Sequence, residues 1–274
     1  MQRLDGKKLS EKILNNLKKE IESRQLKLKL AVVLVGDNYV SKTFINQKQK
    51  AAEKIGIDFQ LYRFEEKIES DELKKEIEKI VKDSANSGVV IQLPLPKKFN
   101  THDVLNLVPR GKDTDVLSEE SLGKFYQGTL GILPPTVNGI LKLLRNYKIE
   151  LLGKNIVVVG AGRLVGFPLA IKLLREKATL SVLNEFTKDA PAFIRKADIL
   201  ISAVGKPNLI KGDMVKKGAV VIDAGSSMEK GEIVGDVDFK SVSKKASYIT
   251  PVPGGVGPMT VACLLENLIN LNKK

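Results

Sequence analysis

The chain has 274 residues and a formal net charge of +13, from 45 Lys and Arg against 32 Asp and Glu. Its single histidine, His102, and single cysteine, Cys263, exclude disulfide scaffolds and zinc sites built from clustered His or Cys, and they argue against a Ser-His-Asp triad. No window approaches the roughly 18 apolar residues that span a bilayer, and the N-terminal stretch holds no apolar signal core. We therefore expect a soluble, cytoplasmic protein.

The first half of the chain alternates stretches with apolar residues at helical spacing and continuous apolar runs typical of buried strands. The predicted helices cover residues 9–21, residues 41–55 and a stretch from Ser70, and the predicted strands cover residues 28–35, 58–64 and 88–93. Residues 108–136 show no clear periodicity and are rich in Pro, Gly and Asp, which is typical of loops at a domain junction.

The second half repeats this alternation after a predicted helix over residues 137–146. Its predicted strands cover residues 155–159, 179–183, 199–203 and 219–223, and its further helices cover about 165–174 and 261–271. Continuous apolar strands that alternate with helices predict parallel sheets covered by helices on both faces. We expect a two-lobed α/β protein with a cleft. Residues 1–136, completed by a C-terminal helix over 258–274, form a catalytic lobe, and residues 137–257 form a Rossmann-type nucleotide-binding lobe.

A glycine-rich loop opens the second lobe. The strand 155–159 runs directly into Gly160-Ala161-Gly162-Arg163-Leu164-Val165-Gly166 and then a helix. Such glycines permit a tight turn and bring a pyrophosphate close to a helix N-terminus, although the spacing is one residue longer than the usual fingerprint. The context predicts a nucleotide site, and the alternative is a tight strand–helix turn.

A carboxylate follows this loop by about twenty residues, at the end of the next predicted strand. Glu185 can accept hydrogen bonds from the ribose 2′-hydroxyl of NAD and would repel the 2′-phosphate of NADP. We therefore predict that the protein favours NAD, while a solvent-exposed surface Glu is the alternative interpretation.

The first lobe and the C-terminal region carry weaker polar signals. Phe44 and Lys48 share one helix face, which by itself indicates an ordinary helix pair, and Gln92 ends a predicted strand. Asp113 and Asp115 are too few to predict a metal site. Residues 250–260 hold three Pro and three Gly just before a helix, which indicates a loop whose shape is used for binding.

Five segments, in order along the whole chain, match one known family: residues 35–57, 92–96, 203–207, 235–239 and 249–262. Together these segments resemble the bifunctional methylenetetrahydrofolate dehydrogenase/methenyltetrahydrofolate cyclohydrolase family. The resemblance implies that a hydride passes from 5,10-methylenetetrahydrofolate to NAD or NADP, and that water then opens the methenyl cation to 10-formyltetrahydrofolate. It also implies a homodimer formed through the nucleotide lobe.

The resemblance assigns roles to individual residues. Lys48 resembles the catalytic lysine that assists attack of water, Gln92 the partner that orients it, and Asp115 the aspartate that binds the pterin ring. The substrate-binding positions are Phe44, Lys48, Gln92, Pro94, Asp115, Gly257 and Pro258. The cofactor-binding positions are Thr136, Gly160, Ala161, Gly162, Arg163, Val165, Gly166 and Glu185. No metal is expected.

The chain departs from the family at several of these positions. Phe44 replaces the usual Tyr, Val116 replaces a Gly after Asp115, and Gly162 replaces a Ser. Residues 134–137 read Pro-Pro-Thr-Val instead of the usual Pro-Cys-Thr-Pro. Ala161 and Glu185 stand where the family places Arg against a 2′-phosphate, in agreement with NAD. These changes leave open a folate-binding cyclohydrolase with impaired dehydrogenase activity.

Two further alternatives come from other classes of protein. A different two-lobed NAD-dependent dehydrogenase would share the fold but not the folate pocket. A nucleic-acid-binding module would suit the pI of about 9.6, but Lys alternates with Glu on predicted helices and the chain has no Trp. We therefore expect a small folate substrate as the partner, whose polyglutamyl tail suits the excess of Lys, and no nucleic acid or membrane.

Overall fold

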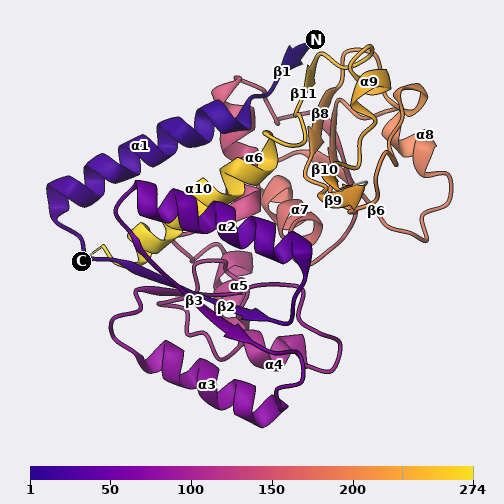
Figure 1. The fold of residues 1–274 in the computed structure, drawn as a ribbon. Coiled ribbons are helices and arrows are strands. Elements are labelled where there is room, and N and C mark those ends of the chain that lie inside the picture. Colours follow the sequence, from indigo (N-terminus) through magenta and orange to yellow (C-terminus); the bar gives the residue numbers. More distant parts are fainter. Residues whose placement is uncertain (230, 274) are drawn as a thin grey trace. The chain divides into compact units, whose positions relative to one another are not determined.

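The computed structural model describes residues 1–229 and 231–273 (Figure 1). Contacts divide the chain into two compact units. The six-stranded unit holds residues 1–10 and 136–260, and the three-stranded unit holds residues 11–135 and the chain from Val261 onward. None of the helices in the described part of the chain is both long and apolar enough to cross a membrane.

The three-stranded unit is built on a parallel sheet in the order β3-β2-β4. Its strands are β2 (Lys29–Val35), β3 (Asp58–Phe64) and β4 (Gly88–Ile91). Its helices are α1 (Gly6–Arg24, in part), α2 (Tyr39–Lys54), α3 (Ser70–Lys82), α4 (Thr101–Leu105), α5 (Glu119–Gln127) and most of α10 (Val256–Leu271).

Helices cover both faces of this small sheet, which explains why β2 is apolar at almost every position. Leu30, Val32 and Leu34 pack in one core cluster with apolar residues of α1, α2 and α10. The alternating residues Ala31 and Val33 pack in a second cluster with residues of α3 and α4. A strand whose side chains alternate between two buried faces reads as a continuous apolar run.

The six-stranded unit holds a parallel sheet in the order β1-β11-β8-β7-β5-β6. Its strands are β1 (Gln2–Arg3), β5 (Asn155–Val159), β6 (Thr179–Leu183), β7 (Ile199–Ser202), β8 (Val220–Asp223) and β11 (Tyr248–Ile249). The remaining elements are α6 (Pro135–Asn146), α7 (Gly166–Arg175), α8 (Ala190–Ile194), a 3₁₀ turn η1 (Gly212–Met214), the antiparallel pair β9 (Ser227–Glu229) and β10 (Glu232–Val234), and α9 (Phe239–Val242).

The strand order reverses at β5. The chain places β6 on one side of β5 and then returns to place β7 on the other side. Such a reversal opens a crevice at the carboxyl ends of the strands, where open parallel sheets bind their ligands. The loop after β5 lies at this point.

The structure confirms the predicted α/β class with parallel sheets, and β3, β5 and β6 have the predicted bounds. Several local features differ from the expectation, among them the following three. Helix α5 lies in the stretch predicted as loops, capped by Ser118 and ended by Gly128 in the left-handed region. Helix α10 begins at Val256, because a proline is tolerated in a first helical turn. The first ten residues join the six-stranded unit, because β1 pairs with β11.

Candidate active site

Lys48 lies on the buried face of α2. The buried residues of this helix are Ser41, Ile45, Lys48 and Ala52, which recur at helical spacing. Asn38 caps the helix by accepting a hydrogen bond from the Ser41 N–H at 3.0 Å. Only 6% of Lys48 is exposed, so an amine occupies a position where this helix otherwise places apolar or small side chains.

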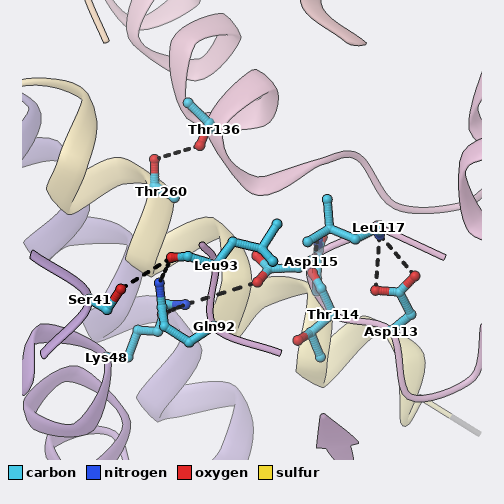
Figure 2. A network of polar contacts seen from close by, with 11 residues as sticks. Ser41, Lys48, Gln92, Leu93, Asp113, Thr114, Asp115, Leu117, Thr136 and Thr260 are labelled. Atoms are coloured by element: carbon cyan, nitrogen blue, oxygen red, sulfur yellow. Dashed lines mark hydrogen bonds and ion pairs between the residues drawn. The ribbon is translucent and has the colours of Figure 1, made fainter. Parts of the chain in front are cut away.

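Gln92, at the carboxyl end of β4, accepts a hydrogen bond from the Lys48 amine. The Lys48 Nζ donates to Gln92 Oε1 at 3.0 Å (Figure 2). The Gln92 Nε2 donates to the Leu93 carbonyl at 2.8 Å, and the Ser41 hydroxyl donates to the same carbonyl at 3.3 Å. The amide nitrogen is therefore engaged with the backbone, and this leaves the amide oxygen directed at the lysine.

Asp115 brings a carboxylate to the same cluster. Its Oδ2 lies 4.0 Å from Lys48 Nζ. Asp113, two residues earlier, turns back into its own loop and accepts hydrogen bonds from the N–H groups of Leu117 and Ser118 and from the Ser118 hydroxyl. From α10, the Asn267 side chain donates to the carbonyl of Thr114 at 2.9 Å. The loop is thus fixed on both sides of Asp115.

Burial changes the proton affinities of this cluster. It lowers the pKa of the Lys48 amine, because the charged form loses its hydration, and the Asp115 carboxylate opposes this shift. Burial also raises the pKa of the Asp115 carboxyl, an effect that Lys48 opposes and Asp113 reinforces. A lowered pKa makes the neutral amine, which can accept a proton, easier to reach than in an exposed lysine, and this suits a general acid–base group.

The other predicted substrate-binding residues are divided between the two units. Phe44 lies partly buried on α2, one turn before Lys48, and Pro94 is exposed after a cis bond to Leu93. Both belong to the three-stranded unit with Lys48. Gly257 and Pro258 lie in the first turn of α10, within the six-stranded unit.

The glycine-rich loop lies at the reversal point of the larger sheet. Gly160 has φ +99°, and a Cβ there would lie 2.5 Å from the Ala203 carbonyl oxygen. A Cβ on Gly166 would lie 1.7 Å from the Gly160 carbonyl oxygen, so β5 and the start of α7 approach too closely for any side chain. Between these two contacts Ala161, Gly162 and Arg163 are exposed. The loop therefore presents backbone to solvent beside a helix N-terminus.

Glu185 lies at the same edge of the sheet, because β6 is the neighbour of β5. The turn around it is held by Asn184, whose side chain accepts from the Phe186 N–H at 3.0 Å and whose own N–H donates to the Thr187 hydroxyl. Glu185 itself is exposed. Thr136 lies instead in the first turn of α6, where its hydroxyl is 3.1 Å from that of Thr260 (Figure 2).

The sequence analysis missed residues that support the Lys48 cluster. Ser41 and Asn267 both hold backbone carbonyls at the site. Asn267 is almost fully buried on the otherwise apolar α10, and a polar residue in such a position is the signal that could have identified it.

Comparisons with known proteins give the family. The catalytic-domain model of the tetrahydrofolate dehydrogenase/cyclohydrolase family matches residues 4–115, and the NAD(P)-binding-domain model of the same family matches residues 134–274. The chain belongs to the tetrahydrofolate dehydrogenase/cyclohydrolase family. It is 46% identical over 273 residues to the bifunctional protein FolD of Hydrogenobaculum, a match covering 99% of this chain and 98% of the relative.

Solved structures agree with this assignment. The crystal structure of the bifunctional FolD from Campylobacter jejuni has a TM-score of 0.93 at 44% identity, with 99% of this chain and 98% of that chain covered. A shikimate dehydrogenase from Aquifex aeolicus, at 19% identity and a TM-score of 0.56, covers 90% of this chain and 92% of that chain and shares the fold alone.

These findings confirm the predicted family, fold and enzyme class. The protein is a bifunctional enzyme of one-carbon metabolism, with methylenetetrahydrofolate dehydrogenase and methenyltetrahydrofolate cyclohydrolase activities. Its second domain binds NAD(P). A different two-lobed dehydrogenase and a nucleic-acid-binding module are no longer needed as explanations.

Proposed function

We propose that the cyclohydrolase reaction of this enzyme takes place at the cluster of Lys48, Gln92 and Asp115. The observation that carries the proposal is the buried Lys48 amine, 3.0 Å from an oriented amide oxygen and 4.0 Å from a carboxylate. A lysine held in this way is distinct from the many exposed lysines of the chain, because its burial favours the neutral form that can act as a base.

Hydrolysis needs one proton acceptor close to the methenyl carbon. Water adds to this carbon while its proton passes to the neutral Lys48 amine. The bond from the carbon to N5 of the folate then breaks, the new hydroxyl becomes the formyl carbonyl, and its proton goes to N5, so that one proton is released overall. The positively charged methenyl group further favours a neutral neighbouring amine, because like charges repel in a buried site.

The neighbouring residues would hold the folate in place. Gln92 Oε1 fixes the direction of the Lys48 amine, and the Asp115 carboxylate can accept hydrogen bonds from the N–H groups of a pterin ring. The Phe44 ring, on the same helix, offers an apolar surface for stacking but no hydroxyl. Pro94, Gly257 and Pro258 remain proposed contacts of the folate.

The dehydrogenase reaction needs a dinucleotide on the six-stranded unit. The contacts at Gly160 and Gly166 leave an exposed loop of Ala161, Gly162 and Arg163 where a pyrophosphate can meet backbone N–H groups, with Val165 directly before the helix. Thr136 remains a proposed cofactor contact on α6. A bound nicotinamide supplies the acceptor for the hydride, and the residues of the chain need only align the two rings.

We propose that the enzyme prefers NAD to NADP. Glu185 is an exposed carboxylate just after the strand next to the glycine-rich loop, where it can accept from ribose hydroxyls and repel a 2′-phosphate. The relative from Trypanosoma brucei, 33% identical, was solved with NADP. A comparison of NAD and NADP turnover with 5,10-methylenetetrahydrofolate decides the question for this chain.

We also propose a cytoplasmic homodimer that forms through the six-stranded unit. β6 is an edge strand of its sheet, and exposed apolar side chains gather on it and around α7, at Val182, Leu164, Phe167 and Leu174. An exposed apolar surface beside an unpaired edge strand suits a protein–protein contact. Sedimentation equilibrium gives the mass in solution, and a monomer would contradict this proposal.

The experiment that tests the Lys48 proposal replaces this residue by Met. Lys48→Met keeps the apolar stem and removes the amine, and we expect the enzymatic hydrolysis of methenyltetrahydrofolate to fall by about a hundredfold or more. NADH binding, measured by fluorescence, should stay as in the parent enzyme. Lys50→Met is the matched control, because Lys50 lies exposed on the same helix. Normal hydrolysis by Lys48→Met would remove Lys48 from the proposed role.

A further inference from the structure

Two aspartates that have no role in the sites described above are buried at the carboxyl end of the larger sheet. Asp223 ends β8 and is 3% exposed, and Asp236 follows β10 and is fully buried. Burial of a carboxylate is costly unless hydrogen bonds replace its lost hydration. The partners of these two carboxylates therefore show what the fold uses them for.

Asp236 accepts hydrogen bonds from a loop about thirty residues earlier in the chain. Its Oδ2 accepts from the Ser202 hydroxyl at 2.8 Å and from the Val204 N–H at 2.7 Å. Its Oδ1 accepts from the N–H groups of Gly205 and Lys206 at 2.8 and 2.9 Å. Three consecutive backbone N–H groups thus converge on one buried carboxylate. This contact joins two of the family blocks, residues 203–207 and 235–239, to which no role has been given.

Asp223 holds the segment that carries Asp236. Its Oδ1 accepts from the N–H groups of Gly225 and Asp236 at 2.9 and 3.1 Å, and its Oδ2 accepts from the Val237 N–H at 2.9 Å. The fit is close: a Cβ on Gly235 would lie 2.0 Å from Asp223 Oδ2, and one on Gly225 would lie 2.1 Å from Asp236 Oδ1. The two carboxylates therefore form one chain of contacts from β8 to the loop after β7.

The loop after β7 lies against the glycine-rich loop. The Ala203 N–H donates to the Val159 carbonyl at 2.8 Å, and the Ala203 carbonyl fills the space where a side chain on Gly160 would stand. The adenosine ribose is proposed to bind at Glu185, just after β6. A dinucleotide that starts there and crosses the carboxyl end of β5 extends toward β7 and β8. The loop held by Asp236 therefore lies on the nicotinamide side.

We propose that Asp236 is a positioning residue for the dinucleotide. Its carboxylate holds residues 204–206 in the place that receives the nicotinamide half of the cofactor, and Asp223 holds Asp236. This inference rests on the dinucleotide site proposed above at the glycine-rich loop. It adds that the cofactor position depends on a buried carboxylate that does not itself touch the cofactor.

The test replaces Asp236 by Asn. In Asp236→Asn the new side-chain amide nitrogen would face at least one N–H donor of the loop, so one hydrogen bond is lost and two donors oppose each other. We expect the Kd for NADH to rise roughly tenfold, with a matching rise in the KM for the nicotinamide substrate. Amide hydrogen exchange in the peptide that contains residues 203–207 should become faster.

Hydrolysis of added methenyltetrahydrofolate is the internal reference. Lys48, Gln92 and Asp115 belong to the other unit, so Asp236→Asn should leave this rate within about twofold of the parent enzyme. Asp238→Asn is the matched control. It makes the same chemical change two residues further on, where the side chain caps α9 by accepting from the Ser241 N–H, and Asn is an equally good cap. This variant should bind NADH normally.

Each outcome either supports or overturns the proposal. Unchanged NADH affinity and unchanged exchange in Asp236→Asn would overturn it, and so would an equal loss of hydrolysis and NADH binding. If Asp236→Asn does not fold, Ser202→Ala decides, because it removes one hydrogen bond to the same carboxylate and should weaken NADH binding about threefold with hydrolysis unchanged. Failure of the parent enzyme to bind either NADH or NADPH would instead overturn the dinucleotide site proposed at the glycine-rich loop.

Discussion

The stability of the protein should fall as the pH rises through the weakly acidic range, because of Asp223. Burial raises the pKa of this carboxyl from 3.8 to about 6, although the N–H groups of Val237, Asp236 and Gly225 oppose the shift. The folded state therefore holds this proton more tightly than the unfolded chain does. Its contribution to the free energy of unfolding is present in full below the unfolded pKa and is lost as the pH rises through about 6.

The size of the effect follows from the shift. A change from 3.8 to about 6 corresponds to about 3 kcal/mol at about 1.36 kcal/mol per pKa unit. Asp223→Asn isolates this contribution, because Asn stays neutral at every pH. The free energy of unfolding of the parent protein minus that of the variant should therefore fall by about 2.5 kcal/mol between about pH 4 and pH 8, because the unfolded carboxyl is already about half ionised at pH 4.

Urea unfolding of both proteins at intervals across this pH range measures the difference. Taking the difference between the two proteins removes the contributions of the other titrating groups. A cost of losing a hydrogen bond that does not depend on pH shifts the whole difference curve without changing its slope. Asp213→Asn serves as the control, because it makes the same chemical change at an exposed position at the start of η1, away from the buried Asp223. A difference for Asp223→Asn that stays flat with pH would refute the reasoning.

Three further predictions concern the two sites. Gln92→Met keeps the size of the side chain but removes the acceptor for Lys48, so methenyltetrahydrofolate hydrolysis should fall about tenfold while NADH binding stays unchanged, and an unaffected rate would contradict the orienting role. Glu185→Arg should shift the NADP/NAD ratio of kcat/KM upward by about tenfold or more, whereas an unchanged ratio would mean that Glu185 only faces solvent. Thr114→Val should stabilise the protein by about 1 kcal/mol in urea unfolding, because the buried Thr114 hydroxyl has no hydrogen-bond partner among the described residues. A loss of stability in this variant would show that the hydroxyl does form a hydrogen bond.

Local patterns in the sequence predicted the scaffold well. β5, the glycine-rich loop and the start of α7 follow one another directly, so the apolar run and the glycine spacing carry the information. Helix α5 was not predicted, because nine residues give too short a periodic pattern within a stretch rich in loop-forming residues. Its Ser118 cap and Gly128 end are recognisable only once the helix is known.

The chemistry of the Lys48 cluster was harder to predict. The spacing of Phe44 and Lys48 fits any helix pair, and only the resemblance to the family singled out this lysine. The contact of Lys48 with Gln92 joins residues 44 positions apart, so it depends on how α2 packs on the sheet. Asp236 is a similar case, because its partners lie about thirty residues earlier in the chain.

The glycine-rich loop also offers a place for a reporter group. Gly160 and Gly166 tolerate no side chain, but a Cβ on Gly162 would meet nothing within 4 Å. Cys263 is fully buried, so a thiol introduced by Gly162→Cys would be the one readily labelled thiol of the chain. A fluorophore attached there would sit beside the proposed pyrophosphate position and could follow cofactor binding and release in real time, independently of either reaction.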